Sequence, residues 1–193
     1  MNYLAHAFLA GPDPAALAGA LLGDFVKGAQ LEQYPPIVRA AIRTHRRIDH
    51  YTDTHDLVSA SRRLVSPARR RFAGIMVDVF YDHFLARHWS RFSAEALPTF
   101  TARVYRALQA QPSTPERLQR MLPRMCAEDW LAHYGDPAAI DLAIDGIARR
   151  LKRPSTLPGG GEELRQRYPA FEAHFLEFFP QLMAHVPRLA APH

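Results

Sequence analysis

The sequence lacks the features of a disulfide-stabilised or membrane-spanning protein. It contains one cysteine, Cys126, in 193 residues, so an intramolecular disulfide is excluded. The apolar run near the start, AALAGALLG, is too short to span a bilayer, and no basic segment precedes it as in a signal peptide. We therefore expect a cytoplasmic protein without stable membrane association.

The sequence also has little that is typical of β-strands. No stretch shows sustained alternation of apolar and polar residues with β-branched enrichment. Helix starts are frequent instead, because Asp13, Ser66, Thr114 and Asp136 each precede a proline, as an N-cap residue does before a first helical turn. The sequence predicts an all-α fold.

With 48% hydrophobic and 22% charged residues, the composition is that of a globular protein, and we expect one domain over residues 1–193 with about eight helices. Pro123, Pro169 and Pro180 are expected to break or kink their segments. The expected helices lie near residues 2–10, 14–23, 35–50, 55–65, 67–90, 97–111, 115–134, 137–151 and 161–186.

The formal net charge of +5 favours polyanions or acidic proteins as partners. Positive charge gathers in the stretch SRRLVSPARRRF, which contains Arg62, Arg63, Arg69, Arg70 and Arg71. Such a run is often only a solvated surface. It could also bind an anion, since guanidinium groups suit phosphates and carboxylates. It lacks the interleaved aromatic residues of a single-strand nucleic-acid platform, so nucleic acid is not the expected partner.

Two acidic residues interrupt the most apolar segment, MVDVFYDHFLARHW at residues 76–89. A helix that is apolar nearly all round is expected to be central and buried. Asp78 and Asp82 are one helical turn apart, so their carboxylates point the same way. Two buried like charges require a shared proton or nearby cations. Arginine salt bridges and a divalent metal both satisfy that requirement.

A second segment contains further nitrogen and oxygen atoms that could ligate a metal. In HRRIDHYTD, His45 and Asp49 share one helix face, which places an imidazole beside a carboxylate. Asp24 in LLGDFVKG adds a carboxylate, although it could simply end a helix, and His6 in NYLAHAF is a histidine in an apolar setting. A set of N and O donors without thiolate suits Mn²⁺, Mg²⁺ or Fe²⁺ better than a structural zinc.

The motifs MNYLAHAFLA, LLGDFVKG, HRRIDHYTD and DVFYDHFLARHW, in this order, resemble the acyl carrier protein phosphodiesterase family, also called acyl carrier protein hydrolase. The later EDWLAHYG and FFPQLM are similar too. The resemblance implies an all-α fold related to the HD-domain phosphohydrolases. It also implies hydrolysis of the phosphodiester that joins 4′-phosphopantetheine to a serine of acyl carrier protein, with a divalent cation, usually manganese.

The resemblance also implies roles for individual residues. As metal ligands it suggests Asp24, His45, Asp49, Asp78 and Asp82. As catalytic residues it suggests His6 or His83 for protonating the leaving serine oxygen. Independently of the resemblance, Arg46 and Arg47 lie in sequence between His45 and Asp49, where either could contact a substrate phosphate. The arginines at 62, 63, 69, 70 and 71 would face the acidic carrier protein.

One departure from the HD pattern affects these assignments. A His-Asp pair is absent from the core motifs, and the nearest equivalent is the reversed pair Asp82-His83. Adjacent helical residues point about 100° apart, so we expect only Asp82 of the two to ligate. Two other functions stay open: an HD-like phosphohydrolase acting on nucleotides or other small phosphodiesters, and a non-enzymatic basic helical module in which these acids are structural.

Overall fold

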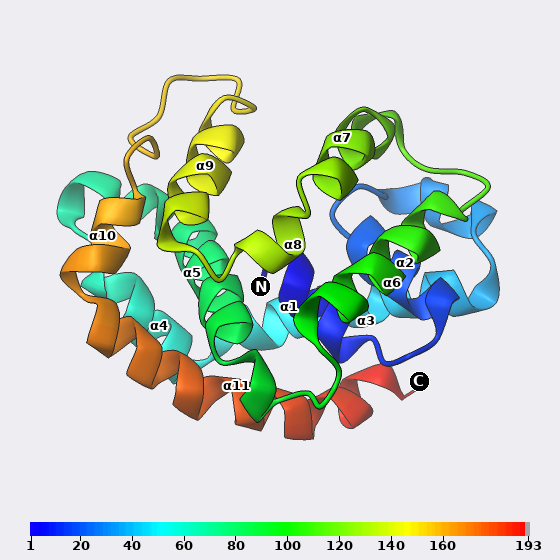
Figure 1. Cartoon of the computed structure of the whole chain (residues 1–193), viewed down its shortest axis with the longest axis horizontal. Helices are drawn as coiled ribbons and strands as arrows, with labels where there is room; N and C mark the ends of the chain where they lie inside the picture. The colour runs from blue at the N-terminus through cyan, green and yellow to red at the C-terminus, as the bar shows by residue number, and fades with distance from the viewer. Residues whose placement is uncertain (192–193) are drawn as a thin grey trace.

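The computed structural model describes residues 1–191 and confirms the all-α prediction, since this part of the chain contains no β-strand (Figure 1). Within it, no helix is both long and apolar enough to cross a membrane. The α-helices are α1 (Tyr3–Leu9), α2 (Pro14–Leu22), α3 (Pro36–Thr54), α4 (Asp56–Leu64), α5 (Ala73–Arg87), α6 (Leu97–Gln109), α7 (Glu116–Ala127), α8 (Trp130–His133), α9 (Pro137–Ala148), α10 (Gly161–Gln166) and α11 (Tyr168–Ala190). Three 3₁₀ segments are η1 (Gly28–Gln33), η2 (Pro67–Phe72) and η3 (Trp89–Arg91).

Side-chain caps start two helices where the sequence predicts them. Asp13 accepts hydrogen bonds from the backbone N–H groups of Ala15 and Ala16 at the start of α2. Asp136 accepts one from Ala138 at the start of α9. Each carboxylate satisfies backbone donors that the first turn leaves without a helical partner.

Three expected helices are each divided in the structure, so the expected number of about eight is too low. The segment 67–90 becomes η2, α5 and η3. The segment 115–134 divides at Asp129, whose φ of 40° is left-handed and ends the helical path. The segment 161–186 becomes α10 and α11.

Of the three expected interruptions, the one at Pro169 is confirmed, since α10 ends at Gln166 and α11 begins at Tyr168, whereas Pro123 and Pro180 do not break their helices. Pro123 lies inside α7, and α11 runs through Pro180 to Ala190. Pro169 lies in the first turn of α11, where a proline removes no helical hydrogen bond. In α11 the buried side chains of residues such as Phe175 and Phe179 stabilise the helix despite the bond lost at Pro180.

Helix α5 is buried in the centre, as its apolar sequence predicts, with Phe80, Phe84 and Leu85 fully enclosed. Helix α11 runs along one edge of the molecule and packs against α3, α4 and α5 (Figure 1). Helices α2 and α3 approach closely at Gly19, where an added Cβ would lie 2.6 Å from that of Ala41. This close packing places the end of α2 beside the middle of α3, where the candidate site lies.

Candidate metal centre

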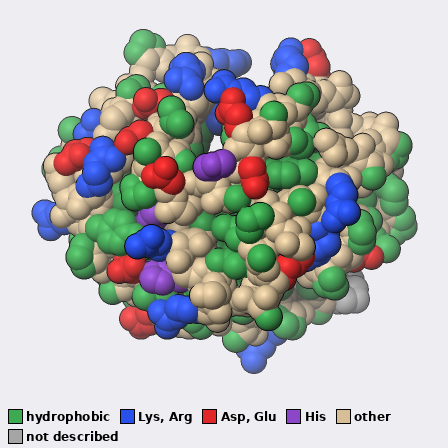
Figure 2. Space-filling view, in the orientation of Figure 1, with side chains coloured by type: hydrophobic (Ala, Val, Ile, Leu, Met, Phe, Trp, Pro, Cys, Tyr) green, Lys and Arg blue, Asp and Glu red, His purple; other side chains and the backbone are tan. Residues whose placement is uncertain are grey.

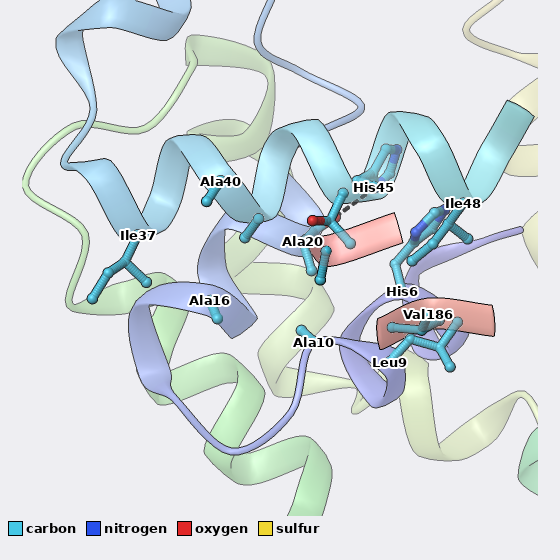
Figure 3. Close-up of a pocket in the computed structure, with 13 residues that line it drawn as sticks. His6, Leu9, Ala10, Ala16, Ala20, Ile37, Ala40, His45, Ile48 and Val186 are labelled. Carbon is cyan, nitrogen blue, oxygen red and sulfur yellow. Dashed lines mark hydrogen bonds between the residues drawn. The ribbon is translucent and has the colours of Figure 1, made fainter. Parts of the chain in front are cut away.

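Two histidines from different helices stack at the centre of the site. His6 of α1 and His45 of α3 have ring centroids 3.6 Å apart and an interplanar angle of 18°. Both side chains are buried, and both lie in the wall of the pocket drawn in Figure 3. The His45 ring lies against the end of α2 at Gly23, where a Cβ would clash with it. A side chain of any other type at position 23 would therefore displace His45.

Asp49 joins the two imidazoles. Its Oδ1 lies 2.9 Å from His6 Nε2, and its Oδ2 lies 3.2 Å from His45 Nε2. Asp24 Oδ1 is 3.6 Å from the same His45 nitrogen. Ligand atoms of His6, His45 and Asp49 all lie within 4.8 Å of one another. Two imidazole nitrogens and a carboxylate at this separation form a donor set that could hold a divalent cation.

A backbone contact fixes the orientation of His45. The Nδ1 of His45 lies 2.6 Å from the carbonyl oxygen of Ala20, which only accepts, so Nδ1 donates. In the neutral ring this leaves the Nε2 lone pair facing Asp24 and Asp49. Metal-ligating histidines are oriented in the same way by a carbonyl or carboxylate on their other nitrogen. The local geometry of His45 therefore fits a ligand.

The stacked histidines have opposite protonation preferences. Burial and the neighbouring His45 cation lower the pKa of His6 to about 4. Burial also disfavours the charged form of His45, but its contacts with Asp24 and Asp49 outweigh this and raise its pKa to about 9. The same histidine contacts outweigh burial at both carboxyls, so the pKa values of Asp24 and Asp49 are lowered. The site thus attracts positive charge, which a proton or a metal could supply.

Asp78 extends the site toward the start of the chain. The α-amino group of Met1 lies 3.1 Å from Asp78 Oδ1 and 3.4 Å from Asp49 Oδ1. Burial disfavours the ammonium form, yet the two carboxylates outweigh it and raise the amino pKa to about 10. Burial raises the pKa of Asp78. No residue-type pattern signals this amino group, and the sequence analysis missed it.

Asp82 and His83 lie apart from the three-residue group. The Oδ2 of Asp82 accepts a hydrogen bond from the Leu4 N–H at 2.7 Å, and Oδ1 accepts one from the Ala5 N–H at 3.0 Å. His83 contacts the carbonyl oxygen of Tyr134 through Nδ1 and the hydroxyl of Tyr168 through Nε2. These contacts give both residues local partners, and their suggested roles as ligand and acid stay predictions.

Most of the predicted arginine surface is engaged within the molecule. Arg62 pairs with Asp53, Arg69 with Glu163, and Arg70 donates to two backbone carbonyls. Arg63 and Arg71 are exposed and make no ion pair or side-chain hydrogen bond with the described residues. In the space-filling view, Lys and Arg side chains gather at the rim of a hollow between α9 and α7 (Figure 2). Arg46 is exposed and donates to the Val26 carbonyl, two residues beyond Asp24.

Comparison with known proteins identifies the group to which these motifs belong. A family model described as acyl carrier protein phosphodiesterase matches residues 1–182. A relative of that name from Photorhabdus laumondii is 40% identical over 187 residues, which cover 95% of this chain and 93% of the relative. One from Escherichia coli strain K12 is 38% identical over 192 residues, covering 98% of this chain and all of the relative. No solved structure shows a significant match.

Proposed function

Because the chain belongs to the acyl carrier protein phosphodiesterase family, we propose that it hydrolyses the phosphodiester between 4′-phosphopantetheine and a serine of acyl carrier protein. The products are the apo carrier protein and 4′-phosphopantetheine. The observation that supports this most is the group of buried His6, buried His45 and half-buried Asp49, which brings together residues from two of the N-terminal motifs. Such a group suits hydrolysis assisted by a divalent cation.

We propose that His6, His45 and Asp49 hold this cation, with Asp24 beside them. The N and O donors favour Mn²⁺, with Mg²⁺ and Fe²⁺ as alternatives. When bound, the metal would polarise a phosphoryl oxygen and lower the pKa of a coordinated water. Asp82 supports the site indirectly, because its bonds to Leu4 and Ala5 hold α1, and with it His6, against α5.

Other residues of the site would handle the phosphate and the departing serine. Arg46 lies beside the Asp24 loop, where its guanidinium can turn from the Val26 carbonyl to a phosphate oxygen. The candidate proton donors for the serine oxygen are His6 and His83; Nε2 of His6 contacts Asp49, and His83 lies between the Tyr134 carbonyl and the Tyr168 hydroxyl. Asp78 pairs with the Met1 α-amino group at 3.1 Å.

The direct test uses purified protein, holo acyl carrier protein and Mn²⁺, with mass spectrometry to follow loss of the prosthetic group. We expect Asp49→Asn to lower kcat by about 100-fold or more, because it removes a ligand charge. Asp53→Asn is the matched control, since Asp53 lies one turn further along α3 and pairs with Arg62. Chelation should abolish activity, and added Mn²⁺ should restore it.

Three results would contradict the proposal. No loss of prosthetic-group mass with any divalent metal would exclude the reaction itself. Turnover of nucleotides or other small phosphodiesters, with the carrier protein left intact, would instead identify a phosphohydrolase for small molecules. Full activity in the Asp49→Asn variant would exclude the metal site as drawn.

A further inference from the structure

A group of basic residues that the sequence analysis did not single out lies where α9 ends. Four of the five residues from 149 to 153 are basic and exposed: Arg149, Arg150, Lys152 and Arg153. Within residues 1–191 none of them forms an ion pair, and the nearby Asp145 of α9 instead accepts a hydrogen bond from the Gly159 N–H. Four uncompensated like charges at one place repel one another and produce a local positive potential.

Helix α7 carries a further unpaired arginine across the hollow from this group. On α7, Arg120 and Arg124 pair with neighbouring glutamates, whereas Arg117 forms no ion pair with the described residues. From the end of α9, Arg150 Nη1 approaches α7 to 3.5 Å from the Sδ of Met121, a weak acceptor that leaves the charge uncompensated. Unpaired positive charge therefore lies on both sides of the hollow seen in Figure 2.

This hollow adjoins the candidate metal centre. Phe25 directly follows Asp24 in the chain, and its ring stacks on Tyr3 of α1, with centroids 6.1 Å apart, while the Arg117 guanidinium lies 5.4 Å from the same ring. Burial and Asp24 raise the pKa of Tyr3 to about 12, and Arg150 and Arg117 oppose this rise. Tyr3 is therefore close enough to sense both Asp24 and the two arginines. The Asp24 side chain is 42% exposed, so the metal centre is open to solvent at Asp24.

We propose that an acidic surface of the carrier protein docks on a basic rim formed by Arg117, Arg149, Arg150, Lys152 and Arg153. Docking there places the serine-linked arm of the carrier beside the hollow that adjoins Asp24. Guanidinium groups suit carboxylates, and no aromatic side chain lies within residues 149–153 to stack on a nucleic-acid base, which favours an acidic protein. The inference rests on the proposed function for the identity of this partner.

Docking can be measured without turnover, because apo carrier protein lacks the phosphodiester that the enzyme hydrolyses. We expect Arg149→Glu/Arg153→Glu to weaken binding of apo carrier protein about tenfold or more at low ionic strength, measured by isothermal titration against the Mn²⁺-loaded full chain. KM for holo carrier protein should rise by a similar factor, with kcat near its wild-type value. Arg91→Glu/Arg188→Glu is the matched control, since both arginines are exposed and lie on η3 and α11, away from the end of α9 (Figure 1). It changes the net charge equally and should leave binding nearly unchanged.

A zero-length cross-link can locate the contact. The chain has two lysines, Lys27 and Lys152, and Lys152 belongs to the basic rim. A carbodiimide joins a lysine amine to a carboxylate that touches it. We expect cross-linked peptides between Lys152 and acidic residues of apo carrier protein. They should be lost in Lys152→Arg, which keeps the positive charge but not the amine.

Four results would overturn the proposal. They are the absence of measurable binding, equal weakening by the two double variants, cross-linking through Lys27 but not Lys152, and tighter binding of a single-stranded oligonucleotide than of apo carrier protein. Equal weakening would show that net charge alone attracts the partner, and the oligonucleotide result would identify nucleic acid as the partner. If wild type is cross-linked through Lys152 but releases no prosthetic group from holo carrier protein, the proposed function fails and the docking surface stands.

Discussion

At the scale of single residues, the site depends on how tightly His45 is held. Its ring lies between Gly23 of the preceding turn and His6, and its two nitrogens face Ala20 on one side and Asp24 and Asp49 on the other. Little free space remains for another rotamer. Groups that bind a metal or a transition state gain from such fixed geometry, because no reorganisation is required during the reaction.

Gly23→Ala tests this constraint. The added Cβ would clash with the His45 ring, so we expect the imidazole to move and kcat to fall about tenfold or more, since misplacement by about 1 Å can cost up to 100-fold. Gly146→Ala in α9 is the control, because its Cβ would meet only the end of a flexible arginine 3.7 Å away. Steady-state kinetics and thermal unfolding of both variants provide the measurement. A Gly23→Ala enzyme with normal kcat would show that His45 needs no fixed position.

Residue spacing predicted one part of the site better than the others. His45 and Asp49 are one turn apart, so their proximity follows from helical geometry alone. His6 could be identified only as a histidine in an apolar setting, because its stacking on His45 depends on how α1 and α3 pack. The contacts of Asp82 are with backbone N–H groups, which every sequence supplies and no residue pattern marks.

At the scale of helices, the two hydrogen bonds between α5 and α1 are the main interactions that position His6. Asp82 of α5 accepts hydrogen bonds from two backbone N–H groups in the first turn of α1. An N-cap side chain makes the same kind of bond, but it immediately precedes the helix that it caps, whereas Asp82 lies on a different helix. Helix α1 has only 7 residues and is too short to be stable alone, so tertiary contacts must fix it.

Asp82→Asn should therefore destabilise the protein by about 1–3 kcal/mol at pH 5, because the amide NH₂ cannot accept from the second N–H donor. Asp13→Asn is the matched control, since Asp13 accepts both of its N–H bonds through one oxygen, and Asn caps helices as well as Asp. Denaturant unfolding measures both changes. Equal stability of the two variants would mean that the buried contact contributes no more than the exposed cap.

The same carboxyl group makes stability depend on pH. Burial raises the pKa of Asp82 from 3.8 to about 7, despite the opposing bonds from Leu4 and Ala5. At a pH between 3.8 and about 7, the folded state binds one more proton at Asp82 than the unfolded chain does. The contribution of this proton to folding stability is therefore complete below about pH 4 and is lost as the pH rises toward 7. We expect the stability difference between wild type and Asp82→Asn to shrink over this range by up to about 1.4 kcal/mol per pH unit. Parallel pH profiles for the two proteins would contradict this.

The existence of most helices was predictable from the sequence, but the positions where several of them are interrupted were not. Proline and N-cap signals predicted the starts of α2 and α9. The breaks at η2 and at Asp129 are set by how neighbouring elements pack, for example by the bond from Tyr105 to Asp129. The continuation of α11 through Pro180 has the same kind of cause, because its buried phenylalanines outweigh the local penalty.

At the scale of the whole molecule, net charge and exposed arginines bear on the proposed carrier-protein substrate. Of the five predicted arginines, Arg63 and Arg71 make neither an ion pair nor a side-chain hydrogen bond with the described residues and are the best placed to meet an acidic partner. Exposed charges of this kind mainly speed association and are screened by salt.

The double variant Arg63→Glu/Arg71→Glu should raise KM for holo acyl carrier protein by about tenfold at low ionic strength, with little change in kcat. The difference from wild type should vanish near 1 M salt, where the Debye length is about 3 Å. Arg120→Glu/Arg124→Glu changes the net charge equally on α7, where both arginines pair with glutamates. An equal rise in KM for both double variants would show that net charge alone matters.

The path of the chain also determines when the site can be completed during synthesis. The residues of the candidate metal centre lie within the first 82 positions, whereas α11, which covers α3, α4 and α5, begins only at Tyr168. At about 5–20 residues per second, a nascent chain would carry the site residues outside the ribosome for several seconds before α11 follows. During that interval, the apolar sides of α3 and α4 that later contact α11 are open to chaperones or to other nascent chains.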